Sequence, residues 1–278
     1  MKRILVSALI LIIASVNAQD FQGVATYKSK RKIDIKLDST QVNSEMHNQM
    51  VEMMKKQFEK TYKLTFNKEE SIYKEEEKLS APQPAGMQMV MINTGGSDLL
   101  YKNTKDKRFT NQNESFSKLF LIKDSLTTYD WKLSSETKNI GEYTCYKATF
   151  SGEVEVIESS ISINGDNEDE EEREPKMETR ITTAWYTPQI PVNNGPGNYH
   201  GLPGLILEVN DGSETVICSR IVMNPIDKVK ITEPTKGKEI TQEAYDKVME
   251  KKMKEMEERY RPRRGDSDGQ SIEIRIGG

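Results

Sequence analysis

The sequence predicts an α+β fold that is mainly β: a curved antiparallel sheet or half-barrel covered by one amphipathic helix, plus a C-terminal helix. Short segments rich in β-branched and aromatic residues recur along the chain, separated by turn residues such as 93–96 and 210–212. Short connections favour antiparallel neighbours, because parallel strands need long crossovers. One face of such a sheet must be covered, and an apolar stripe at helical spacing provides the cover.

The first 18 residues have the pattern of an export signal. Lys2 and Arg3 precede an apolar run over 4–16, and Val16-Asn17-Ala18 places small residues before a cleavage point at Gln19. The apolar run is shorter than the roughly 20 residues of a membrane span. We therefore expect residues 1–18 to be a signal peptide, the mature chain to be periplasmic or secreted, and no transmembrane segment to remain.

Residues 19–235 are predicted to form one β-rich domain. Residues 21–37 contain strand-like segments, and 33–37 alternate with period two. The covering helix is predicted over 38–58, where apolar residues recur every four positions. A hairpin is predicted over 62–73. The further strand candidates are 87–92, 99–102, 116–122, 129–133, 143–150, 154–163, 179–186, 205–209, 214–222 and 229–232.

Two segments differ from this pattern. Residues 164–176 contain an acidic run, which predicts a solvated loop between two strands; Ca²⁺ binding is the alternative, but the run lacks the glycine-spaced loop of an EF-hand. Residues 236–278 form a C-terminal helix and a flexible tail, with Thr241 capping the helix and its end near Arg261-Pro262. Residues 271–276 alternate and predict an added edge strand.

The two cysteines, Cys145 and Cys218, lie in strand-like segments. Export to an oxidising compartment allows a disulfide between them, which would stabilise the chain by about 4 kcal/mol through loop closure. The alternative is two buried free thiols that pack as small apolar side chains.

The densest local signal lies between 184 and 206. The segment 202–205 fits a type II turn, in which proline presets φ at the second position and glycine takes positive φ at the third. A long connection stiffened by prolines predicts either a preorganised binding loop at the rim of the sheet or a buried plug. The residues of this structural motif are Trp185, Tyr186, Pro188, Pro191, Gly195, Pro196, Gly201, Leu202, Pro203, Gly204, Leu205 and Ile206.

These residues resemble the GLPGLI family of exported bacterial proteins, named for the hexapeptide that stands here at 201–206. The upstream segments 141–148 and 184–191 are also similar to the family's. The resemblance covers about residues 20–235. It implies a β-rich fold and a location in the Gram-negative cell envelope. The family has no established function, so the resemblance implies no catalytic residues.

Composition and motifs reduce the number of functions that fit this sequence. With 40 basic and 44 acidic residues, the formal net charge is −4, which argues against nucleic acid as a partner. We find no catalytic motif, assign no catalytic residue and infer no cofactor. A non-enzymatic binding or accessory protein, for an apolar ligand or an outer-membrane partner, fits best. The alternatives are a soft-metal protein, with Met46, His47, Met50 and Met54 as copper ligands, and an uncharacterised enzyme.

Overall fold

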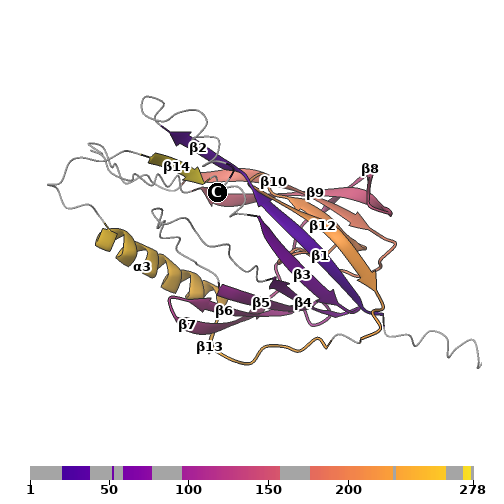
Figure 1. The fold of residues 1–278 in the computed structure, drawn as a ribbon, viewed down its shortest axis with the longest axis horizontal. Helices are drawn as coiled ribbons and strands as arrows, with labels where there is room; N and C mark the ends of the chain where they lie inside the picture. The colour runs from indigo at the N-terminus through magenta and orange to yellow at the C-terminus, as the bar shows by residue number, and fades with distance from the viewer. Residues whose placement is uncertain are drawn as a thin grey trace, which may run out of the picture.

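The computed structural model describes residues 21–37, 52, 59–76, 96–156, 176–227, 230–260 and 272–276. The molecule is built mainly from strands (Figure 1). In chain order the elements are β1 (Gly23–Arg31), β2 (Ile33–Leu37), β3 (Lys60–Phe66), β4 (Glu70–Glu75), β5 (Gly96–Asn103), β6 (Arg108–Ser115), β7 (Lys118–Ser125), β8 (Lys132–Ile140), β9 (Tyr143–Val156), β10 (Lys176–Thr187), β11 (Leu205–Asn210), β12 (Glu214–Met223), β13 (Lys238–Ile240), helix α3 (Gln242–Tyr260) and β14 (Ile272–Ile276).

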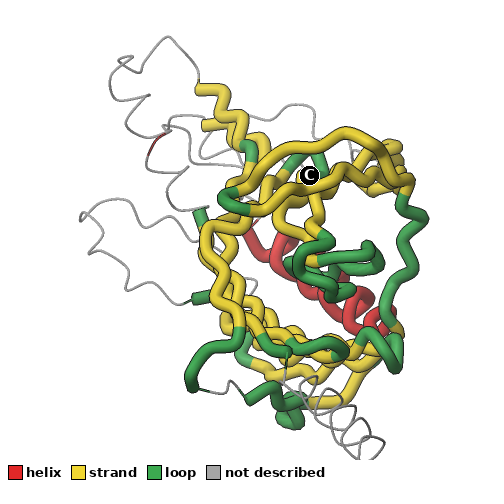
Figure 2. The backbone as a smooth tube through the Cα atoms, turned by 90° about the vertical axis from the view of Figure 1, so that its right-hand side faces the viewer, coloured by secondary structure: helices red, strands yellow, loops and turns green. Residues whose placement is uncertain are grey.

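Twelve of these strands form one sheet, in the order β13-β7-β6-β5-β4-β3-β1-β12-β11-β10-β9-β8. Neighbouring strands are antiparallel, except that β13 runs parallel to β7. The sheet is strongly curved but not closed, and β13 and β8 are its two edges (Figure 2). The predicted fold class, mainly β with a curved sheet and a C-terminal helix, is therefore confirmed.

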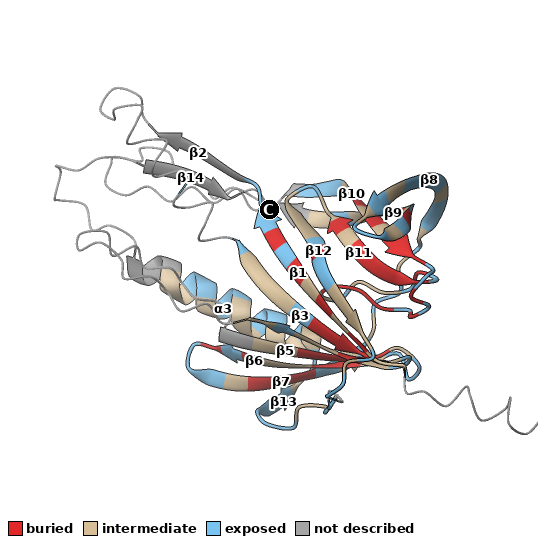
Figure 3. Ribbon diagram, turned by 45° about the vertical axis from the view of Figure 1, so that its right-hand side comes forward, coloured by how far each residue is buried: buried red, intermediate tan, exposed pale blue. Residues whose placement is uncertain are grey.

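The main core lies on the inner side of this curve. Along β1 every second residue is buried, including Ala25, Tyr27 and Ser29, as expected for a strand with one face on a core. Figure 3 shows the same band of buried residues continuing across the neighbouring strands. One cluster joins β1 and β3 to β9, β11 and β12, so residues distant in sequence share a single core.

Helix α3 covers the inner face of β6 and β7. Thr241 caps it, because the backbone N–H of Ala244 donates to the Thr241 hydroxyl at 3.3 Å. The Tyr245 ring contacts Phe120 edge-on at 5.4 Å, and its hydroxyl donates to Asn113 at 2.8 Å. Of the helix predicted over 38–58, only Glu52 is among the described residues, and it is helical.

Several predicted boundaries are wrong for identifiable reasons. Strand β6 was not predicted, because its sequence is mostly polar and polar residues lie on both of its faces. Phe116 and Ser117 form the β6–β7 turn with positive φ values of 51° and 59°, so they are not strand residues. Strand β9 continues through Ser151-Gly152, where a turn was expected, and residues 129–131 precede β8. Residues 230–232 are not in a strand, and 87–92 lie outside the described residues.

The predicted C-terminal strand exists as β14, which pairs antiparallel with β2 in a separate two-stranded sheet. Within the described parts of the chain, no helix is long and apolar enough to cross a membrane.

Both cysteines are free thiols buried in the main core cluster. Burial raises the pKa of each thiol to about 11. The disulfide considered above is absent from this structure, and Cys145 and Cys218 instead pack as small apolar side chains.

Candidate functional site

The long loop over 188–204 leaves the end of β10 and enters the interior of the curved sheet (Figure 2). Its first part runs beside the start of β11, because the N–H groups of Leu205 and Ile206 donate to the carbonyls of Ile190 and Asn194 at 2.9 and 3.0 Å. Val192 and Leu202 are about as buried as any core residue, at 2% and 1% exposure. The loop is therefore packed as part of the core over 194–196 as well, while residues 197–201 are half-buried or exposed.

The glycines of the hexapeptide have different roles from those predicted. Gly204 has no positive φ; the positive φ of 97° lies at Gly201. A Cβ on Gly204 would lie only 2.2 Å from the carbonyl oxygen of Thr187. The predicted type II turn is thus wrong, and glycine is needed at 204 because the loop passes directly against the end of β10.

Lys102 holds this loop from the other half of the sheet. Its side chain is fully buried on β5, and its ammonium donates to the carbonyls of Gly195, Gly197 and Tyr199 at 2.9, 2.6 and 3.2 Å. Burial lowers the pKa of Lys102 to about 7. Tyr27 on β1 binds the strand that follows the loop, because its hydroxyl donates to the carbonyl of Ile206 on β11 at 2.7 Å.

Five ring side chains meet where the loop reaches the open side of the sheet. We call Tyr129, Trp131, Phe150, Tyr199 and His200 the aromatic cluster. Trp131 contacts Phe150 edge-on with ring centroids 4.8 Å apart, and Tyr129 lies 4.9–5.7 Å from the other four rings. Three separate segments supply these rings: the β7–β8 connection, strand β9 and the loop over 188–204.

Hydrogen bonds fix the orientation of the cluster. The Trp131 indole Nε1–H donates to the carbonyl of His200 at 2.8 Å, and Gly201 follows directly against that indole. Burial raises the pKa of Tyr129 to about 12. The pKa of His200 is lowered, chiefly because the ring is partly buried and to a lesser extent because of the Lys102 charge. At neutral pH the cluster is therefore a set of uncharged rings.

Exposed apolar side chains extend the cluster along the edge of the sheet. Leu133 on edge strand β8 is paired with Ala148 on β9, so both point to the same face as Phe150. Leu133 is 60% exposed, and Tyr146, also on this face, is 37% exposed. Half-buried rings that adjoin exposed apolar groups are typical of a surface that binds apolar material.

The one imidazole of the aromatic cluster contacts the protein backbone. The Nδ1 atom of His200 lies 2.9 Å from the carbonyl of Asn198, so its recorded partner is backbone and not a serine, cysteine or carboxylate. Among the described residues there is no group of three or more His, Cys, Asp or Glu suited to holding a metal ion. The candidate copper ligands Met46, His47, Met50 and Met54 lie outside the described residues.

The other motif residues lie apart from the aromatic cluster or support it. Trp185 packs partly against the main core, with the Lys138 ammonium 4.4 Å from its ring centroid. Tyr186 is buried beside Leu202 and Ile206, next to Trp131 and Tyr199. Pro188, Pro191 and Pro203 are exposed, whereas Gly195 and Pro196 are buried. A Cβ on Gly195 would clash with Ile206, which explains the glycine there.

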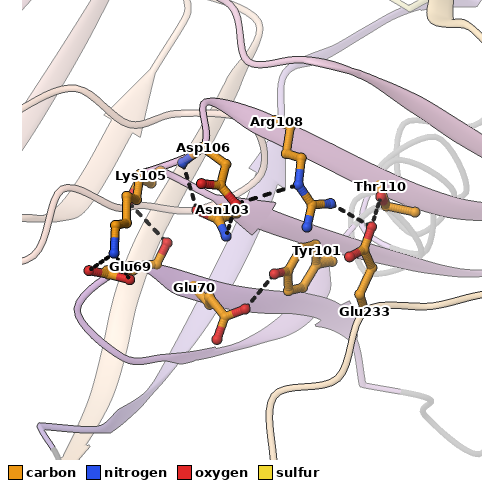
Figure 4. Close-up of polar contacts among 10 residues, drawn as sticks. Glu69, Glu70, Tyr101, Asn103, Lys105, Asp106, Arg108, Thr110 and Glu233 are labelled. Atoms are coloured by element: carbon orange, nitrogen blue, oxygen red, sulfur yellow. Dashed lines mark hydrogen bonds and ion pairs between the residues drawn. The ribbon is translucent and has the colours of Figure 1, made fainter.

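A second polar group of residues lies on the face of β5 and β6 opposite α3 (Figure 4). Glu233, from the segment that leads to β13, accepts from Arg108 and Thr110 at 2.6 Å each. Tyr101 donates to Glu70 at 2.5 Å, and Lys105 pairs with Glu69 at 3.1 Å. We therefore assign the bonds of Glu233 to holding that segment on the sheet, and the other pairs to joining β4 and β5 and the turns beside them.

Comparisons with known proteins show which part of the chain is similar to a known family. Residues 131–208 match the model of a family described as "Protein of unknown function (Porph_ging)". The match begins at Trp131 and ends in β11, so it includes the loop and four of the five cluster rings. The model supports similarity to a family of unknown function; the GLPGLI name stays a prediction.

Among solved structures, the chain is similar to PNGF-II, whose crystal structure was determined in space group C2. The sequence identity is 14% and the TM-score is 0.46. The similarity covers 83% of this chain but only 33% of PNGF-II, so the chain spans about a third of that protein's length. At this level the likeness carries no argument about function. No curated protein matches the chain.

Proposed function

We propose that this protein is a non-enzymatic binding protein of the cell envelope, which holds an apolar ligand, or an apolar segment of an outer-membrane partner, against the aromatic cluster. The main observation behind this proposal is the way in which the rings of the aromatic cluster are held in place. Uncharged rings from three segments are held by a loop that is hydrogen-bonded to Lys102 on β5 and to the start of β11. Such preorganisation lowers the ordering cost of binding.

Burial and position support the proposal. The rings of Trp131 and Phe150 are only partly covered, and Leu133 beside them is mostly exposed. Each large apolar side chain that a ligand covers contributes about 1.5–3 kcal/mol. Three or four such contacts are enough for micromolar affinity once the cost of association is subtracted. The export pattern of residues 1–18 supports the envelope location.

The first test is binding of the neutral apolar probe N-phenyl-1-naphthylamine, followed by its fluorescence. The wild type should bind it saturably, and Trp131→Ala should weaken binding about tenfold, because one ring contact is lost. The control is Trp185→Phe, which changes the other tryptophan, a half-buried side chain that packs against the main core and is not part of the aromatic cluster. Equal losses in both variants, or no saturable binding by the wild type, would contradict the proposal.

A further inference from the structure

The buried lysine on β5 stands out because, within the described part of the chain, its ammonium is bonded to backbone carbonyls and forms no ion pair. The three hydrogen-bond acceptors recorded for the Lys102 ammonium are all main-chain carbonyls of the loop over 188–204. An ammonium has three donors, so these bonds use its full capacity. A buried cation is costly unless its hydrogen bonds are satisfied, and a strand that needed only an apolar core would carry an apolar residue here. The lysine therefore serves the loop.

The loop segment that Lys102 holds is the one that carries two of the cluster rings. The ammonium binds the carbonyl of Tyr199, and the Trp131 indole binds the carbonyl of the next residue, His200. Two consecutive peptide groups are thus fixed by donors from different parts of the chain, strand β5 and the β7–β8 connection. His200 lies between these two peptide groups, and Tyr199 lies between the Gly197 and Tyr199 carbonyls that Lys102 binds. Because a peptide group is planar, fixing these carbonyls restricts the backbone at both residues and so the direction in which their side chains leave it.

We propose that Lys102 is a positioning residue for the aromatic cluster: by binding the carbonyls of Gly195, Gly197 and Tyr199, it holds the Tyr199 and His200 rings against Trp131 and so sets the affinity for the apolar ligand. The claim about affinity rests on the proposed function. The claim about ring position does not, because it concerns the free protein. Lys102 touches none of the ligand surface and acts only through the loop.

The test uses the full chain carrying Trp185→Phe, so that Trp131 is the sole tryptophan. Lys102→Met removes all three donors at similar length. Leu121→Ala is the control, because Leu121 is equally buried, at 1% exposure, on the face of the sheet opposite α3. Both variants should lose thermal stability. Only Lys102→Met should make Trp131 more accessible to acrylamide quenching and weaken binding of N-phenyl-1-naphthylamine about tenfold.

The two readouts separate the two proposals. Trp131 quenching and probe affinity that stay at control values in Lys102→Met would overturn the positioning role. If the wild type binds no probe, the proposed function fails, and the quenching comparison alone decides the role of Lys102. Should Lys102→Met not fold, Lys102→Gln, which keeps one neutral donor group, is measured instead in sucrose, which favours the folded state. Acrylamide quenching of Trp131 in Lys102→Gln should be stronger than in the wild type, but weaker than in a protein whose loop has lost all three Lys102 hydrogen bonds.

Discussion

At the scale of single residues, the fold depends on a few residues whose type is unusual for their buried positions. Lys102 is a buried cation, and Gly204 and Gly195 are glycines in tightly packed places. Each is explained by the loop over 188–204: the lysine satisfies its carbonyls and the glycines let it approach β10 and β11 closely. The loop therefore explains the residue type at two positions within it and, at Lys102, at one position far from it in sequence.

The lowered pKa of Lys102 predicts a pH dependence of stability. Its pKa is about 7 in the folded chain and 10.5 when exposed. Between these values the unfolded chain binds more protons, so this group makes the free energy of unfolding rise as pH increases from about 7 to 10.5. The wild type should therefore gain stability relative to Lys102→Met, by up to about 1.4 kcal/mol per pH unit.

Urea denaturation of both proteins from pH 7 to pH 9 measures this difference, and buried thiols and tyrosines cancel because both proteins contain them. A difference that does not change with pH would mean that the lysine has an ordinary pKa. The neutral amine still has two N–H donors, so the loop keeps part of its anchoring above pH 7.

At the scale of elements, β1, β3, β10, β11 and β12 were predictable because their sequences are rich in β-branched, aromatic and other apolar residues, and in β1 every second residue lies on the core. The same logic missed β6, whose inward-facing Asn113 and Ser115 are buried polar residues bonded to Tyr245 of α3. Hydrophobic periodicity cannot detect a strand whose interior partners are polar. The C-terminal helix was predictable, since Thr241 and its apolar stripe are local signals.

The β6–β7 turn is another element that departs from its preferred sequence. Phe116 and Ser117 both have positive φ, the geometry of a type I′ turn that favours Asn-Gly. Ser117→Gly should therefore stabilise the protein by about 1 kcal/mol. The urea midpoint measures the change. Ser151→Gly, in the middle of β9 with ordinary φ, should have the opposite sign, because glycine weakens a regular strand. A loss of stability in Ser117→Gly would refute the assigned turn.

At the scale of the whole molecule, the curve of the sheet creates the candidate site. The connection from β7 to β8 crosses from the strand beside one edge to the opposite edge, and brings Tyr129 and Trp131 to the loop. The sequence analysis singled out the loop, but it named Trp185 rather than Trp131, because Trp185 adjoins the motif. The rings of the cluster lie up to 71 positions apart and share no local pattern, so only the folded structure reveals them.

The most direct test of the central claim, that the aromatic cluster binds apolar ligands, is photo-cross-linking of the full chain with a naphthalene carrying a diazirine. We predict that label appears on the tryptic peptides 124–132 and 181–220, which contain Tyr129 and Trp131, and Tyr199 and His200. Unlabelled N-phenyl-1-naphthylamine should compete for it. Label confined to peptides of 238–260, or spread over the chain without competition, would contradict the account.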